Sequence, residues 1–229
     1  MSVDQNMSVE QKTKRSSRIP IGDLDERYLA LVRQVTASDP FKRDDDSRVL
    51  GVTSSLSGEG TTTVAANIAL TVAGMASGPV LLVDANDLRP SLHKVFGLKN
   101  TIGFQNALSG GHSPLECITP TVFEGLSLTL SGKLADGEVA LYSNSSIDEL
   151  LDEWRDTFRW IIFDLPPSNN VTSGALLASR MDGALMVVEA DRVDRKIAER
   201  TSARLRRAHA NLLGAVYNKV PKHAGDLAW

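Results

Sequence analysis

A glycine-rich turn between an apolar run and a helical pattern carries the residue types that bind phosphate. Residues 54–60 form the turn, residues 49–52 the apolar run, and residues 61–73 the expected helix. Backbone N–H groups in such a turn, together with a helix N-terminus, attract anionic phosphates. The usual pattern, G-x-x-x-x-G-K-[ST], has a lysine where this chain has Thr61. The segment therefore predicts a nucleotide-binding site. The missing lysine argues against catalytic activity at that site.

Two further apolar runs end in carboxylates, Asp84 after residues 79–83 and Asp164 after residues 160–163. Ligands of open parallel sheets bind beyond the carboxyl ends of the strands, so we expect both carboxylates near the loop. A hydroxyl at the head of a helix with two such carboxylates suits Mg²⁺ beside phosphates. Thr62 would ligate the metal directly, Asp164 would act through water, and Asp84 would hold water or a hydroxyl nucleophile.

Each of these residues also has a simpler interpretation. Glycine-rich loops occur without nucleotide, Asp84 suits a helix N-cap, and Asp164 before two prolines suits a turn. Asn218, which ends the last apolar run, suits a strand end. Their joint occurrence in this order favours nucleotide binding.

The elements that must position these residues alternate between strand and helix. The remaining predicted elements are helices at 23–37, 145–158, 174–181 and 192–210, and strands at 123–130, 184–188 and 212–218. Continuous apolar strands that alternate with helices predict an α/β fold, a doubly wound and mostly parallel sheet. We expect a disordered polar tail at 1–22, a helix and charged linker at 23–47, one domain at 48–222, and a short tail at 223–229. Asp23 is the expected N-cap of the first helix.

Composition excludes several classes of protein. The net charge of −3 over 229 residues gives no general attraction to nucleic acid, and the basic helix at 192–210 is interleaved with acidic residues. The single cysteine suits a reducing cytosol. No apolar run approaches the ~20 residues of a membrane span, so we expect no direct membrane insertion.

Three segments together resemble a known family. Residues 53–63 (Thr-Ser-Ser-Leu-Ser-Gly-Glu-Gly-Thr-Thr-Thr), 81–90 (Leu-Leu-Val-Asp-Ala-Asn-Asp-Leu-Arg-Pro) and 161–167 (Ile-Ile-Phe-Asp-Leu-Pro-Pro) are similar to Walker A, A′ and B motifs. They match bacterial tyrosine kinases of the CpsD/CapB type, cytoplasmic partners of polysaccharide co-polymerases within the MinD/ParA-like P-loop class. The resemblance covers about residues 24–222.

The resemblance implies a P-loop NTPase fold of the SIMIBI, MinD-like kind that binds ATP and Mg²⁺. It also implies a cytoplasmic protein held at the inner membrane through a co-polymerase, and it allows a homo-oligomer. The position of Asn218 contacts adenine in that family. The implied nucleotide-binding residues are Ser57, Gly58, Glu59, Gly60, Thr61, Thr62, Thr63 and Asn218. The implied metal-binding residues are Thr62, Asp84 and Asp164, of which Asp84 and Asp164 are catalytic if the protein is active.

The sequence departs from the family in several places. Thr61 replaces the P-loop lysine, and Leu56 stands where MinD/ParA relatives carry a signature lysine. The A′ pattern D-x-D-x-R has Asn86 and Leu88 in place of its second Asp and its Arg, with Arg89 one position later.

Two further departures concern assembly and phosphate acceptance. The ring-forming arginines of the first helix are replaced by Leu29 and Val32, and residues 218–229 lack the family's tyrosine cluster. Tyr217 falls in a strand expected to be buried, which leaves Tyr142 as the expected loop acceptor. The chain resembles some MinD-like proteins of cellulose secretion in carrying Gly-Thr-Thr-Thr, which makes the change compatible with a nucleotide-binding fold.

The leading hypothesis is an ATP-binding, kinase-like regulator of exopolysaccharide or capsule polymerisation and export, with weak or absent kinase activity. One alternative is an active tyrosine autokinase or ATPase whose cation comes in trans. The other is a MinD/ParA-like positioning ATPase, which the missing signature lysine and the missing amphipathic membrane helix disfavour.

Overall fold

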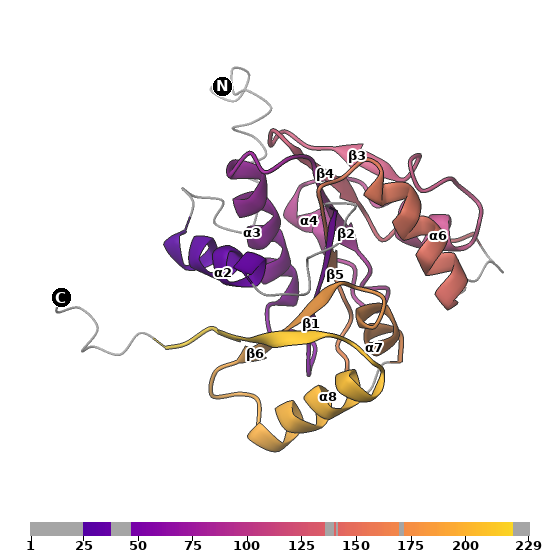
Figure 1. Ribbon diagram of the computed structural model, residues 1–229. Coiled ribbons are helices and arrows are strands. Elements are labelled where there is room, and N and C mark those ends of the chain that lie inside the picture. The colour runs from indigo at the N-terminus through magenta and orange to yellow at the C-terminus, as the bar shows by residue number, and fades with distance from the viewer. Residues whose placement is uncertain (1–24, 38–46, 136–139, 141, 170–171, 222–229) are drawn as a thin grey trace, which may run out of the picture.

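The computed structural model describes residues 25–37, 47–135, 140, 142–169 and 172–221. Its seven strands form one sheet in the order β3-β4-β2-β5-β1-β6-β7, and only β3 and β4 pair antiparallel. The predicted doubly wound, mostly parallel sheet is confirmed (Figure 1). The expected tails at 1–22 and 223–229, and linker residues 38–46, lie outside the described residues.

The described strands are β1 (Arg48–Ser54), β2 (Val80–Asp84), β3 (Ile118–Pro120), β4 (Leu126–Thr129), β5 (Trp160–Asp164), β6 (Gly183–Glu189) and β7 (Leu212–Asn218). The described helices are α2 (Glu26–Ala37), α3 (Thr61–Gly74), α4 (Leu92–Val95), α5 (Phe104–Leu108), α6 (Asn144–Arg155), α7 (Thr172–Ala178) and α8 (Arg195–Arg207).

The sheet separates two apolar clusters. Helices α2, α3 and α4 pack on one face, and α5, α6, α7 and α8 pack on the other, as Figure 1 shows for the larger helices. Strands β2 and β5 are buried at every position, because both faces of a parallel sheet are covered. Helix α3 is apolar on most sides because it lies between the sheet and α2.

Two helices begin later than predicted, and in each an aspartate caps the first turn. Helix α2 begins at Glu26, and Oδ1 of Asp25 accepts a hydrogen bond from the backbone N of Arg27 at 2.9 Å. The expected N-cap, Asp23, lies outside the described residues. Helix α8 begins at Arg195 rather than at residue 192, because the side chain of Asp194 caps its start by accepting from the N of Lys196 at 2.7 Å, and it ends at Arg207 rather than at residue 210.

The shortest helices and strands were not predicted correctly from the sequence. The predicted strand at 123–130 is limited to Leu126–Thr129 and pairs with the unpredicted three-residue strand β3. Helices α4 and α5, of four and five residues, were not predicted either. Elements of this length carry too few residues to display a hydrophobic period.

The expectation that Tyr217 is buried was wrong. Strand β7 is the last strand of the sheet, and Tyr217 on it is 61% exposed. An apolar run at a sheet edge lacks the second neighbouring strand that would help to cover its side chains.

Candidate nucleotide-binding site

The loop after β1 has the backbone of a phosphate-binding turn. Gly58 and Gly60 adopt φ of 89° and 96°, in the left-handed region that favours glycine. A Cβ atom on Gly60 would collide with the side-chain amide of Asn218. Helix α3 begins at Thr61, and in the part of the chain that the structure describes no side chain caps its start. The N–H groups of its first turn therefore have no side-chain partner and are available to an anion.

Glu59 holds this loop from inside the protein. Its fully buried carboxylate accepts from the backbone N of Leu56 and, at 3.0 Å, from that of Glu189 at the end of β6. The side-chain amide of Asn218 donates to the Glu59 carbonyl oxygen at 2.9 Å. Asn218 thus lies beside the loop as expected, whereas the Glu59 side chain supports the loop from behind.

Thr62 joins the loop to the neighbouring strand end. Its Oγ1 donates to Oδ2 of Asp164 at 2.6 Å and lies 2.9 Å from Oγ of Ser91. Asp84 and Asp164 are in register on adjacent parallel strands, and both are fully buried. The structure therefore brings the three predicted metal-binding residues together at one edge of the sheet.

Asp84 also performs the capping role that was its simpler interpretation. Its Oδ2 accepts from the backbone N of Ser91 and of Leu92, at 2.9 and 3.0 Å, at the start of α4. Its Oδ1 accepts from the N of Asn86 at 3.3 Å. This carboxylate consequently fixes the path of the loop that carries Asn86 and Ser91 past Thr62.

Burial perturbs both carboxyl groups. It raises the pKa of Asp84 to about 6, although the backbone N–H groups of Leu92, Ser91 and Asn86 oppose the rise. Burial and then the charge of Asp84 raise the pKa of Asp164 well above its ordinary value, while the hydroxyl of Thr62 lowers it. Two neighbouring buried carboxyl groups with no cation between them resist being charged together.

The donor set fits Mg²⁺. Oδ1 of Asp164 is buried and has no hydrogen-bond partner among the described residues, and it lies on the carboxylate that Thr62 contacts. A divalent cation would satisfy this oxygen and stabilise the ionised form of both carboxylates. Within the described residues no group of three or more His, Cys, Asp or Glu side chains could hold a metal alone. The two carboxylates and the Thr62 hydroxyl instead suit a Mg²⁺ ion that keeps several waters and binds together with substrate phosphates.

A cavity of about 380 Å³ opens at the phosphate loop. Its lining includes most of the predicted loop residues and several that the sequence did not indicate. The lining residues are Ser54, Ser57, Gly58, Gly60, Thr61, Thr62, Thr63, Asn86, Arg89, Ser91, Pro167 and Lys219.

Sequence reasoning missed three charged residues around the loop. Lys219 Nζ donates to the carbonyl oxygen of Gly58 at 2.7 Å, and Arg192 donates to that of Ser57 at 3.0 Å. Both cations pair with Glu189, at 3.2 and 2.6 Å. Only the position of Lys219, directly after Asn218, could have drawn attention to it.

The fold is that of the MinD-like P-loop class. The chain belongs to the family described as cellulose biosynthesis protein BcsQ, which matches residues 48–218. The resemblance to CpsD-type tyrosine kinases is also confirmed by sequence. Tyrosine-protein kinase CpsD of Streptococcus agalactiae is 31% identical over 176 residues, 76% of each chain.

Solved structures agree on the fold. The chimerical protein CapA2B2 superposes with a TM-score of 0.75 at 24% identity, over 89% of this chain and 88% of that one. The septum site-determining protein MinD from Pyrococcus horikoshii, complexed with Mg-ADP, gives 0.64 at 22% identity, over 78% of this chain and 72% of that one.

No helix in the part of the chain that the structure describes is long and apolar enough to span a bilayer.

Proposed function

We propose that this protein binds ATP with Mg²⁺ and regulates the polymerisation and export of an extracellular polysaccharide, with weak or absent kinase activity. The observation that carries the proposal is the contact of Thr62, which lines the cavity, with Asp164, which lies in register with Asp84. These residues lie beside a phosphate loop that has Thr61 in place of lysine. The loop's backbone N–H groups favour nucleotide binding. Catalysis is disfavoured, because Thr61 provides no ammonium group to stabilise the negative charge that develops on a transferred phosphoryl group.

The family and its relatives supply the biological setting of the proposal. Because the matching family is described by cellulose biosynthesis, cellulose is the first polymer to test. The kinase relatives make a membrane polysaccharide co-polymerase the proposed partner, and the protein would lie in the cytoplasm at the inner membrane through that partner.

Calorimetry of the pure protein with ATP tests the binding step. We expect measurable but weak binding in Mg²⁺ and a weaker signal in EDTA. Thr62→Val keeps the shape of the side chain and removes the hydroxyl that contacts Asp164, so it should abolish the difference between the two conditions. No heat at millimolar ATP would refute nucleotide binding.

Genetic complementation tests the polysaccharide step. In a strain that lacks the gene, the wild-type chain should restore exported polymer, measured by dye binding and by sugar analysis, and Thr62→Val should not. Full restoration by Thr62→Val would mean that the function does not need the nucleotide site.

An active tyrosine autokinase is the second candidate, because the buried Asp84, with a pKa raised to about 6, could accept a proton from a hydroxyl. Phosphotyrosine in pure protein incubated with Mg²⁺ and ATP, and lost in Asp84→Ala, would favour it.

A further inference from the structure

The loop lacks its lysine, yet a cation from a distant part of the chain reaches it. Lys219 follows β7, while Gly58 lies in the loop after β1, and the two are joined by the 2.7 Å hydrogen bond from Nζ to the carbonyl oxygen. Lys219 also lines the cavity that Thr61 and Thr62 line. A positive charge therefore lies at the phosphate loop, although Thr61 does not provide it.

The backbone directs this side chain. Lys219 adopts φ of 56°, an uncommon value for a residue other than glycine, directly after the strand ends at Asn218. In the same turn Asn218 is fixed by its hydrogen bond to the Glu59 carbonyl oxygen. If a Cβ were built on Gly60, Cε of Lys219 would lie 3.8 Å from it. The turn thus places the lysine stem against the second glycine of the loop.

The ammonium group keeps capacity for a ligand. Lysine carries three N–H donors. Among the described residues, Nζ contacts the Gly58 carbonyl oxygen and, at 3.2 Å, Oε2 of Glu189. The side chain is 46% exposed, so its remaining donor faces solvent that a phosphate could replace.

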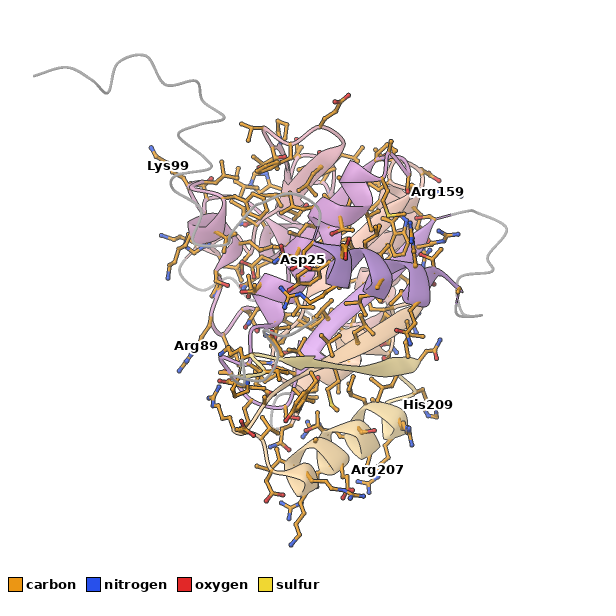
Figure 2. All side chains as sticks on the ribbon, turned by 90° about the vertical axis from the view of Figure 1, so that its left-hand side faces the viewer. Asp25, Arg89, Lys99, Arg159, Arg207 and His209 are labelled. Atoms are coloured by element: carbon orange, nitrogen blue, oxygen red, sulfur yellow. The ribbon has the colours of Figure 1, made fainter. Side chains whose placement is uncertain are left out.

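Two arginines near the loop, Arg192 and Arg89, are less suitably placed than Lys219 to bind phosphate. Arg192 contacts the Ser57 carbonyl oxygen and Glu189 but is not among the residues that line the cavity. Arg89 lines the cavity, but its side chain extends away from the ribbon into solvent (Figure 2). Arg89 therefore serves as the competing assignment in the test below.

We propose that Lys219 binds the phosphates of the nucleotide and supplies, within the same chain, the positive charge that the lysine at position 61 would supply. The inference rests on the proposed nucleotide-binding function. It predicts that a second cation in trans is not needed for binding.

Calorimetric titration with Mg²⁺ and ATP tests this with charge-removing variants. Lys219→Gln keeps a donor for the Gly58 carbonyl oxygen but loses the charge. We expect it to weaken binding by about 10-fold to 100-fold, the effect of losing one charge-assisted hydrogen bond. Lys219→Arg should retain most of the affinity. Lys99→Ala, which removes an exposed lysine that does not line the cavity, is the matched control and should bind as the wild type does.

The double variant tests whether the two positions share one role. Thr61→Lys should restore most of the affinity that Lys219→Gln loses, and it should add less to the wild type, where the charge is already present. Circular dichroism and the melting midpoint of each variant would confirm that the fold is kept.

The outcomes separate the inference from the function on which it rests. Wild-type protein that binds no ATP would overturn both. Wild-type binding that Lys219→Gln leaves unchanged would overturn the inference alone, and so would a loss found in Arg89→Gln instead. A loss that Thr61→Lys fails to reduce would show that Lys219 shapes the loop rather than binding phosphate, which also overturns it.

Discussion

Asp84 and Asp164 occupy the same register on neighbouring parallel strands, so two fully buried carboxyl groups lie side by side next to the phosphate loop. The arrangement is unfavourable without a cation, because burial raises the pKa of both groups. Residues that cost stability in the folded protein are typical of functional sites.

The first prediction concerns the stability cost of Asp164. Since its pKa is raised in the folded state, ionising it opposes folding, and the wild type should lose stability as the pH rises above about 4, the ordinary carboxyl value. Asp164→Asn should raise the free energy of unfolding in EDTA at pH 8 by about 0.5–2 kcal/mol. The gain should vanish near pH 4, where the unfolded carboxyl also takes up a proton. Urea titrations at both pH values measure it.

The same variant should lose the stabilisation that Mg²⁺ with ATP gives the wild type. An Asp164→Asn protein that is destabilised at pH 8, or that still responds fully to Mg²⁺, would contradict the proposed role of this carboxylate.

The second prediction concerns Val32, which stands where the kinases carry an arginine. Val32 is 3% exposed and belongs to the apolar cluster that joins α2 to α3. Val32→Arg would bury a charge there, so it should lower the melting midpoint instead of creating a ring contact. Ala30→Arg, at an exposed position of the same helix, is the control and should change the midpoint little.

Light scattering of the wild type without a partner should accordingly give a monomer or a small oligomer. A stable ring that Ala30→Arg and Leu29→Glu both leave intact would contradict this prediction.

The third prediction concerns tyrosine phosphorylation. Tyr142, the expected loop acceptor, donates its hydroxyl to Asp87 at 3.1 Å, and burial raises its pKa. Tyr217 is the exposed tyrosine of the described residues. We expect no phosphotyrosine by mass spectrometry after incubation with Mg²⁺ and ATP. Modification at Tyr217 that disappears in Asp84→Ala would show an active kinase.

The fourth prediction concerns Cys117, the only cysteine of the chain. It is 2% exposed, and burial raises its pKa to about 11, so the reactive thiolate is scarce at pH 8. A thiol reagent should label the folded protein slowly and the denatured protein at once. Rapid, complete labelling without denaturant would indicate that this region opens readily.

Much of the site could be predicted because its signals are local. Asp84 and Asp164 end continuous apolar runs, and the glycines around Glu59 mark the turn, so neighbours in sequence were sufficient. Contacts between distant segments could not be read in this way. The hydrogen bond from Lys219 to Gly58 depends on the order of the strands, and so does the exposure of Tyr217 on the edge strand.

Glu59 ties the loop to two other segments through Leu56 and Glu189, and Asn218 holds its carbonyl oxygen. A loop held in this way is preorganised: its conformational entropy is lost when the chain folds and not when a ligand arrives. Little further entropy therefore has to be lost in the loop when a nucleotide binds. The protein could therefore bind nucleotide without a large rearrangement of the loop. This suits a protein that senses whether nucleotide is bound better than one that converts hydrolysis into movement.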